Sequence, residues 1–435
     1  MLFNINNVYK RVKASSLFRS SGVYTISNFI NASIPLLLLP VLTEILSPAD
    51  YGIIAMFQIV VGVIYPFIGM NLEGAITRKY YDKDYDNFPS YIGTCLILIM
   101  ISFALVTAVF AGFHGFIQEF TQIPELWLKY ILIVAVSQIM ISINLAVFQV
   151  KVQPIKYGTL QISQSLLNLV LTIILVLVYD RNWEGRLEAQ ISTYFVIAVI
   201  SLITLYGSKQ IKLNIKKSDI LDALKFGIPL IPHFIGGMLF LSIDRFFLTK
   251  LVGLDQTGNF TVAYQIGTVV FLITSAFNVA FVPWLYENLN KNDLKIKYKI
   301  VKFTYLYFGI STIGAIILIG IFPILISIFV RGSFNSVDIY SVFIVFGFVF
   351  QGMYFMVTNY IAYAKKTHIQ AIITLAVGLL KLPIAYFSII WFGAVGASIS
   401  FCLTFFLFFI VTWIYSNRVY SMPWNILTKK KLIVK

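Results

Sequence analysis

The sequence predicts an all-α integral membrane protein with twelve transmembrane helices in two six-helix lobes. Three observations lead to this fold class. Of the 435 residues, 59% are hydrophobic and only 12% are charged, whereas soluble domains carry about 25% charged residues. Apolar stretches of roughly 20 residues, the length that crosses a bilayer as a helix, recur along the chain. Basic residues gather in alternate connections between these stretches, as expected for a multi-pass protein.

Twelve apolar stretches are predicted to cross the membrane. Prolines inside several of them are compatible with helices, because neighbouring helices can satisfy the backbone groups that a proline frees. The connections are short and leave no room for a soluble domain. The predicted spans are residues 21–44, 51–73, 89–113, 126–149, 157–179, 188–207, 226–250, 258–285, 303–329, 339–364, 368–391 and 394–416.

The distribution of Lys and Arg predicts the orientation of these helices. If the N-terminus is cytoplasmic, 26 of the 33 basic residues fall in cytoplasmic segments and five in external loops. This asymmetry follows the positive-inside rule, so both termini are predicted to be cytoplasmic. The net charge of +15 then reflects the excess of basic residues in the cytoplasmic segments, and it also attracts anionic membrane lipids. It requires no nucleic-acid partner.

Internal similarity predicts that the twelve helices form two halves. Residues 46–59 open the second helix and residues 252–266 open the eighth, with Gly52 matching Gly258. These and later matches keep an offset near 206–210 residues. An even number of helices in each half gives parallel repeats, which are related by an axis along the membrane normal. The predicted organisation is an N-terminal lobe (1–208), a cytoplasmic linker (209–225) and a C-terminal lobe (226–435).

Polar side chains in the first half fall on single helix faces. Tyr24, Asn28 and Asn31 are spaced by four and three residues, and Gln164 and Asn168 by four. Unpaired polar groups are costly against lipid, so these stripes are predicted to face other helices or a wet cavity. Asn and Gln also join membrane helices by hydrogen bonds. Helix packing and substrate contact are therefore both open interpretations.

The second half places charges at membrane depth, where they are costly. Lys381 is predicted to pair with Asp244 across the lobes, to line a cavity, or both, and Asp244 is also a candidate for a coupling cation. Arg245 is predicted either to snorkel to the external headgroups or to bind a phosphate through its planar fork. His233 is predicted to fill a helix contact or to couple protons, and Gln265 belongs to a polar stripe of the eighth helix.

Two segments resemble bacterial polysaccharide-biosynthesis flippases, the O-antigen and capsule repeat-unit exporters of the multidrug/oligosaccharidyl-lipid/polysaccharide exporter superfamily. They are YTISNFINASIPLLLLPVLTEILSPADYGIIAMF (24–57) and FGIPLIPHFIGGMLFLSIDRFFL (226–248), the latter followed by GNFTVAYQIG (258–267). The resemblance covers essentially the whole chain. It implies two six-helix lobes around a central cavity, a bacterial cytoplasmic membrane, and an undecaprenyl-pyrophosphate-linked oligosaccharide as substrate.

We therefore expect a flippase that moves such repeat units across the membrane by alternating access, for O-antigen, capsule or exopolysaccharide synthesis. Expected partners are the lipid-linked substrate, membrane lipids, the polysaccharide polymerase machinery, and a coupling ion that is either a proton or sodium. Arg78 is expected on the cytoplasmic side, where the substrate enters. The residues predicted to line the substrate cavity are Tyr24, Asn28, Asn31, Gln164, Asn168, His233, Asp244, Arg245, Gln265 and Lys381.

Enzymatic function finds no support in the sequence. It contains no nucleotide-binding P-loop, no paired catalytic carboxylates in one loop and no metal-ligand cluster, and its two cysteines, Cys95 and Cys402, lie in separate apolar stretches. No cofactor or metal is predicted. One alternative is an ion-coupled drug or cation antiporter of the same fold, whose cavity would need net negative charge. Another is a membrane-embedded glycosyl-transfer enzyme, for which we would expect a large external loop.

Overall fold

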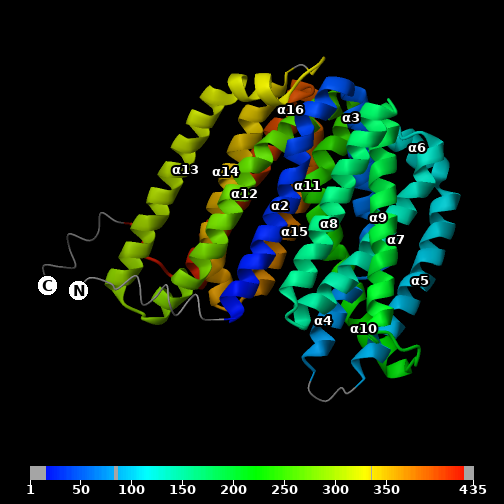
Figure 1. Cartoon of the computed structure of the whole chain (residues 1–435). Helices are drawn as coiled ribbons and strands as arrows, with labels where there is room; N and C mark the ends of the chain where they lie inside the picture. The colour runs from blue at the N-terminus through cyan, green and yellow to red at the C-terminus, as the bar shows by residue number, and fades with distance from the viewer. Residues whose placement is uncertain (1–15, 83–86, 335, 426–435) are drawn as a thin grey trace, which may run out of the picture. The chain divides into compact units, whose positions relative to one another are not determined.

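The computed structural model describes residues 16–82, 87–334 and 336–425, and their regular elements are all helical (Figure 1). Side chains at residues 16–22, 24–26, 28 and 239 lie outside this description. The helices up to residue 207 are α2 (Ser16–Ile45), α3 (Pro48–Gly69), α4 (Leu72–Tyr80), α5 (Phe88–Gly112), α6 (His114–Thr121), α7 (Glu125–Val150), α8 (Pro154–Ile173) with a π-helical turn η1 (Ile174–Val178), and α9 (Asn182–Gly207).

The remaining helices include two that are unusually long, α12 and α13. In chain order the elements are α10 (Lys217–Gly227), a 3-10 turn η2 (Ile228–Leu230), α11 (Ile231–Leu251), α12 (Leu254–Asn290), α13 (Leu294–Phe329), α14 (Val337–Tyr363), α15 (Thr367–Phe392) and α16 (Val395–Val419).

Local sequence accounts for several helix boundaries. Asp50 accepts hydrogen bonds from the backbone amide and the hydroxyl of Ser47, and Ser47 accepts one from the amide of Asp50, which closes the first turn of α3. Asp293 accepts a hydrogen bond from the amide of Lys295 and caps α13. At the other end of a helix, Gly393 has a φ of 60°, a conformation that glycine tolerates well, and terminates α15.

The predicted all-helical, multi-pass class is confirmed. The described residues contain eleven helical stretches that are long and apolar enough to cross a membrane, and α2 adds a shorter apolar stretch, Phe29–Ile45. The predicted seventh span, 226–250, contains a change of helix type. The chain there runs through α10, η2 and α11, because proline lacks the amide hydrogen that a continuous helix needs. Helix α10 lies largely within the segment predicted as a linker.

The chain forms two compact units, which we describe separately. Unit 1 comprises residues 1–46 and 53–235, and unit 2 comprises residues 47–52 and 236–435. The first turn of α3 thus belongs to unit 2, and the division of the chain into 1–208, 209–225 and 226–435 stays a prediction. In unit 1, α7 packs against α4 and α9, while α8 packs against α2 and α9.

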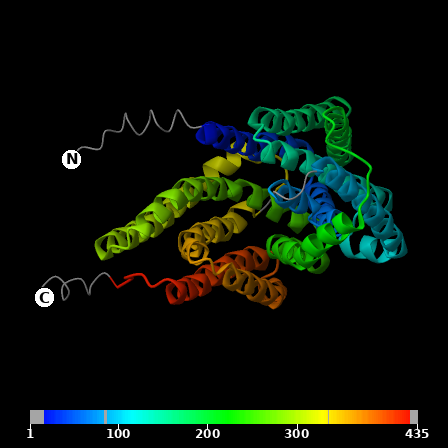
Figure 2. The same cartoon turned by 90° about the horizontal axis from the view of Figure 1, so that it is seen from below.

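Unit 2 is built around α14, which packs against α12, α13 and α16. Helices α15 and α16 lie side by side, drawn in orange and red in Figure 2. A buried apolar cluster joins the end of α12 to the start of α13 and includes Phe281, Leu285, Ile300 and Val301. This cluster holds the two long helices together near their connecting turn.

Two glycines allow the first turns of α3 and α12 to touch within unit 2. A Cβ atom on Gly258 would overlap the backbone carbonyl of Pro48, and one on Gly52 would overlap that of Leu254. The contact is reciprocal, because each glycine receives the backbone of the other helix. These are the two positions that the internal similarity had matched.

Candidate functional site: a polar cavity in unit 1

Helices α2, α3, α7, α8 and α9 of unit 1 enclose a cavity of about 360 Å³. Amide side chains form the largest group in its lining, with further contributions from hydroxyl groups, apolar residues and one arginine. The arginine is Arg186, and no carboxylate occurs among the described residues that line the cavity. The six amide residues are Asn31, Gln58, Gln138, Gln164, Asn168 and Gln190.

Arg186 reaches the cavity from the first turns of α9. Its Nη1 atom donates hydrogen bonds to Asn168 Oδ1 at 2.8 Å and to Thr172 Oγ1 at 3.1 Å. The preceding residue, Gly185, lets the start of α9 pack closely on the π-helical turn, because a Cβ atom there would lie 3.0 Å from the carbonyl oxygen of Leu175. π-Helical turns often occur at functional sites. Here the turn places α9 so that Arg186 spans two turns of α8.

Helix α2 contributes both a side chain and a backbone feature. Asn31 Oδ1 accepts a hydrogen bond from the hydroxyl of Ser165 on α8. Four residues later, Pro35 also lines the cavity, and its nitrogen has no hydrogen to donate to the carbonyl of Asn31. The backbone carbonyl of Asn31 therefore lacks its usual donor within the helix and is an additional hydrogen-bond acceptor at this depth.

Two buried polar atoms of α9 lack a hydrogen-bond partner among the described residues. They are Gln190 Oε1 and Thr193 Oγ1. Both residues line the cavity one and two turns beyond Arg186. Because buried polar atoms are generally hydrogen-bonded, these two are suited to partners that enter the cavity, such as water or the hydroxyl groups of a sugar.

Three of the residues predicted to line a cavity meet here. Asn31, Gln164 and Asn168 line this cavity, and their contact with a substrate stays a prediction, whereas the side chains of Tyr24 and Asn28 lie outside the described residues. The sequence reasoning missed Arg186, which it assigned to an external loop because the sixth span was predicted to begin at residue 188. The structure begins α9 at Asn182.

A recognisable signal for the missed residues exists in the sequence. Arg186, Gln190, Thr193 and Tyr194 are spaced by four, three and one residues, which places them on one helix face. Extending the predicted helix by two residues would have included Arg186 and completed this pattern. Gln58 stands alone among apolar residues, and no such pattern marks it.

Lys381 and Asp244 form a buried ion pair, as the sequence predicted. Lys381 Nζ lies 2.6 Å from Asp244 Oδ2, and neither side chain is more than 1% exposed. The ammonium also donates a hydrogen bond to the carbonyl of Phe240. The expectation that the pair bridges the two lobes is wrong, because α11 and α15 contribute these residues within unit 2.

Arg245 is buried against aromatic rings of α12. Only 9% of the residue is exposed, and its guanidinium carbon lies 4.1 Å from the ring centroid of Tyr264 and 5.5 Å from that of Phe260. A cation over an aromatic face is stabilised by the ring quadrupole. The preceding Asp244 turns toward Lys381 instead, so the two adjacent charges have different partners.

Two other predicted residues lie apart from the unit 1 cavity. His233 is exposed near the start of α11, with its ring 6.0 Å from that of Phe234. Gln265 is half-buried on α12 of unit 2, where its backbone carbonyl accepts a hydrogen bond from the hydroxyl of Thr268. The substrate-contact roles of these two residues, and those of Asp244, Arg245 and Lys381, stay predictions.

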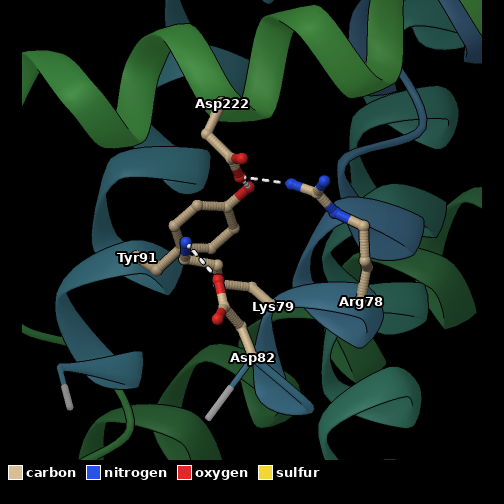
Figure 3. Close-up of polar contacts among 5 residues, drawn as sticks. All are labelled: Arg78, Lys79, Asp82, Tyr91 and Asp222. Carbon is tan, nitrogen blue, oxygen red and sulfur yellow. Dashed lines mark hydrogen bonds and ion pairs between the residues drawn. The ribbon is translucent and has the colours of Figure 1, made fainter. Parts of the chain in front are cut away.

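Arg78 belongs to a polar cluster that joins α4, α5 and α10, shown in Figure 3. Its Nη2 atom lies 2.5 Å from Asp222 Oδ2, which also accepts a hydrogen bond from the Tyr91 hydroxyl at 2.8 Å. The hydrogen bond to Asp222 raises the pKa of Arg78. The neighbouring Lys79 pairs with Asp82 at 2.9 Å. An anion that reaches Arg78 would have to compete with a carboxylate already bound there.

The fold is shared with solved membrane transporters. The lipid II flippase MurJ, in an inward closed conformation, matches with a TM-score of 0.70 at 15% identity, covering 91% of this chain and 87% of that chain. An inward-facing multidrug resistance MATE family transporter of the MOP superfamily matches with a TM-score of 0.69 at 14% identity, covering 92% of this chain and 96% of that chain.

Sequence comparison gives the family. An "uncharacterized membrane protein" of Haemophilus influenzae is 23% identical over 356 residues, which cover 81% of this chain and 85% of that relative. The family model described as "polysaccharide biosynthesis protein" matches residues 17–289, well over half of the chain. The resemblance seen in the sequence is thereby confirmed, and this chain belongs to the polysaccharide biosynthesis protein family.

Proposed function

We propose that this protein is a flippase that moves undecaprenyl-pyrophosphate-linked oligosaccharide repeat units across the bacterial cytoplasmic membrane, for O-antigen, capsule or exopolysaccharide synthesis. The observation that carries the proposal is the amide-rich cavity of unit 1 with Arg186 in its wall. Membership of the polysaccharide biosynthesis family and a fold shared with a lipid II flippase support it.

The chemistry of the cavity suits the polar part of such a substrate. Amide side chains both donate and accept hydrogen bonds, and sugar hydroxyl groups do the same. The unpaired Gln190 Oε1 and Thr193 Oγ1 supply acceptors inside the protein. A guanidinium binds phosphate oxygens through paired, charge-assisted hydrogen bonds, so Arg186 is the residue we assign to the pyrophosphate.

The positive charge of Arg186 disfavours the main alternative, a drug or cation antiporter. An antiporter of drugs or organic cations needs a carboxylate to replace the hydration of its positively charged ligand. Among the described lining residues the ionised group is Arg186, which repels cations. We therefore place anionic, sugar-bearing ligands ahead of organic cations for this cavity.

Transport would proceed by alternating access, in which the cavity opens first to the cytoplasm and then to the outside. We propose that both termini are cytoplasmic, so that the basic inner loops attract the anionic substrate before it enters. A proton or sodium gradient is a candidate energy source, and the polysaccharide polymerase machinery is a candidate recipient of the product.

The test is the level of surface polysaccharide in a strain that lacks its own flippase and carries variants of this protein. Arg186→Ala should lower export about tenfold or more, because hydrogen bonds to charged groups contribute about 1.5–3 kcal/mol. Arg186→Lys should retain part of the activity, since it keeps the charge and loses the planar fork. Arg186→Glu should lose the most, through repulsion of the phosphates.

Arg181→Ala is the matched control. Arg181 lies five residues earlier, is about half exposed and pairs with Glu188 at 2.9 Å outside the cavity lining. Polymer levels should be normalised to the amount of protein in the membrane. Normal export by Arg186→Glu at normal abundance would contradict the assignment of the pyrophosphate to this cavity.

A further inference from the structure

Unit 2 contains an apolar groove that the proposed transport cycle has not used. The groove has a volume of about 500 Å³ and runs between α12 and α13, with Val349 of α14 at its base. These two helices follow one another in the chain and are drawn in green and yellow-green in Figure 2. Its walls are almost entirely apolar and include Ile273, Leu306 and Ile310. Leu306 and Ile310 are 56% and 61% exposed, so the groove opens to its surroundings.

The groove is long as well as apolar. On α13 its lining extends from Phe303 to Leu318 along one helix face. Fifteen residue steps at about 1.5 Å each give a length of roughly 22 Å. Half of the hydrocarbon core is only about 15 Å thick, so an acyl chain confined to one leaflet could not fill this length. A longer, single hydrocarbon chain could.

Two lysines continue the same helix face beyond the groove. Lys299 and Lys302 precede Phe303 and Leu306 by four residues each, which places them one turn nearer the start of α13 on the same stripe. Both are exposed, and neither has an ion-pair partner among the described residues. The positive charge therefore lies at one end of an apolar slot, and a ligand with an anionic head and a long apolar tail is complementary to it.

Aromatic side chains define the boundary between the basic and apolar parts. The rings of Phe277 and Tyr307 stack with their centroids 4.7 Å apart, and Phe277 also lies against Phe303 at 6.2 Å. Farther along, the wall opens at Gly314, where an added Cβ atom would meet nothing within 4 Å. Aromatic rings thus line the groove next to the lysines, and the groove is open at Gly314.

We propose that this groove holds the polyprenyl chain of the lipid-linked substrate in a loading step, in which Lys299 and Lys302 bind its pyrophosphate before Arg186 does. The proposal rests on the proposed function and adds a subsite for the lipid part. Tail and head are bound by neighbouring parts of one helix, so the lipid is recognised independently of its sugar. The groove would then retain the carrier lipid without needing the polar cavity to bind it.

The experiment measures binding of undecaprenyl pyrophosphate without sugar to the purified full-length protein by native mass spectrometry. Gly314→Phe should reduce the affinity about tenfold or more, because Gly314 lines the groove, has room for an added Cβ atom and would direct a ring into the space of the lipid chain. Gly309→Phe is the matched control on the same helix. Its position is equally open but does not line the groove, so binding should be unchanged.

The head-group site is tested on exposed residues whose substitution leaves the apolar packing untouched. Lys299→Glu combined with Lys302→Glu should lower the affinity about tenfold or more, because each surface lysine contributes attraction to an anionic lipid and each glutamate repels it. Lys366→Glu, an exposed lysine at the start of α15, is the control. Equal binding by the control and by the double variant would overturn the head-group assignment.

Phosphatidylglycerol distinguishes a carrier-lipid site from an ordinary lipid site. It should bind weakly and respond equally to Gly314→Phe and Gly309→Phe. If it occupies the groove as tightly as the polyprenyl probe and is lost with Gly314→Phe, the site takes general lipids and the proposal is wrong.

Wild-type-like probe binding by Gly314→Phe, with export still lost in Arg186→Ala, overturns the groove alone. Loss of the probe in Gly314→Phe, with normal export by Arg186→Glu, supports the groove and contradicts the assigned cavity.

Discussion

Lys381 and Asp244 lie 2.6 Å apart where neither side chain reaches solvent. Removing two charges from water costs several kcal/mol each, and their mutual attraction offsets this only when the geometry is good. The contact between Lys381 and the carbonyl of Phe240 adds a second acceptor for the ammonium. The pair is therefore a site where losing one member harms the protein more than losing both.

We expect Lys381→Ala and Asp244→Ala each to destabilise the protein by about 3–5 kcal/mol, because each leaves an unpaired buried charge. The double variant Lys381→Met with Asp244→Leu should melt closer to the wild type than either single variant. Thermal unfolding of the purified protein in detergent measures this, with the exposed Lys366→Ala as control. Single variants that melt like the control would show that the pair contributes little.

Arg245 allows a structural role to be separated from a transport role. Its guanidinium lies over Tyr264, and a desolvated contact of this kind is worth about 2 kcal/mol. We expect Arg245→Glu to lower the amount of folded protein, because it buries a second carboxylate beside Asp244. Export per protein molecule should change little, unlike in Arg186→Glu. Lost export at normal abundance would instead favour the phosphate contact that the sequence suggested.

At the scale of elements, glycine decides how closely helices approach. The first turns of α3 and α12 meet through Gly52 and Gly258, each of which lies against a backbone carbonyl of the other helix. Backbone cannot move aside as a flexible side chain can. Any side chain at these positions must push the two helices apart.

Gly258→Ala should therefore destabilise unit 2 by about 1–3 kcal/mol, the usual range for overpacking. Gly236→Ala is the control, since an added Cβ atom there meets nothing within 4 Å. That change should be neutral or should stabilise α11, because alanine has the higher helix propensity. Equal melting temperatures for the two variants would contradict the close contact.

At the scale of the whole molecule, the distribution of basic residues leads to a test of topology. We expect the segment before α10 to be cytoplasmic and the start of α7 to be external, by the positive-inside rule. A cysteine introduced at Lys216 should resist a membrane-impermeant thiol reagent in intact cells, and one at Lys129 should react. Both positions are exposed, and the native Cys95 is buried. Labelling at Lys216 would overturn the proposed orientation.

Much of the architecture follows from the sequence because membranes impose a strong constraint. A helix must satisfy its own backbone in lipid, so each apolar stretch of sufficient length has one stable form. The third, fourth, tenth, eleventh and twelfth predicted spans end within three residues of the observed helices. Spacing within one helix also identified the face of α8 that carries Gln164 and Asn168, and the cost of lone charges predicted that Lys381 and Asp244 pair.

The partners of those faces were decided by tertiary structure. Periodicity shows which side chains of one helix point the same way, but it does not show which helices meet. Arg186 was assigned to a loop until the packing of α9 on α8 placed its guanidinium against Asn168 and Thr172. Arg245 needed a partner at membrane depth, and only the approach of α12 shows that this partner is Tyr264. A charge at membrane depth needs a partner that offsets its desolvation, and the tertiary packing determines which group that partner is.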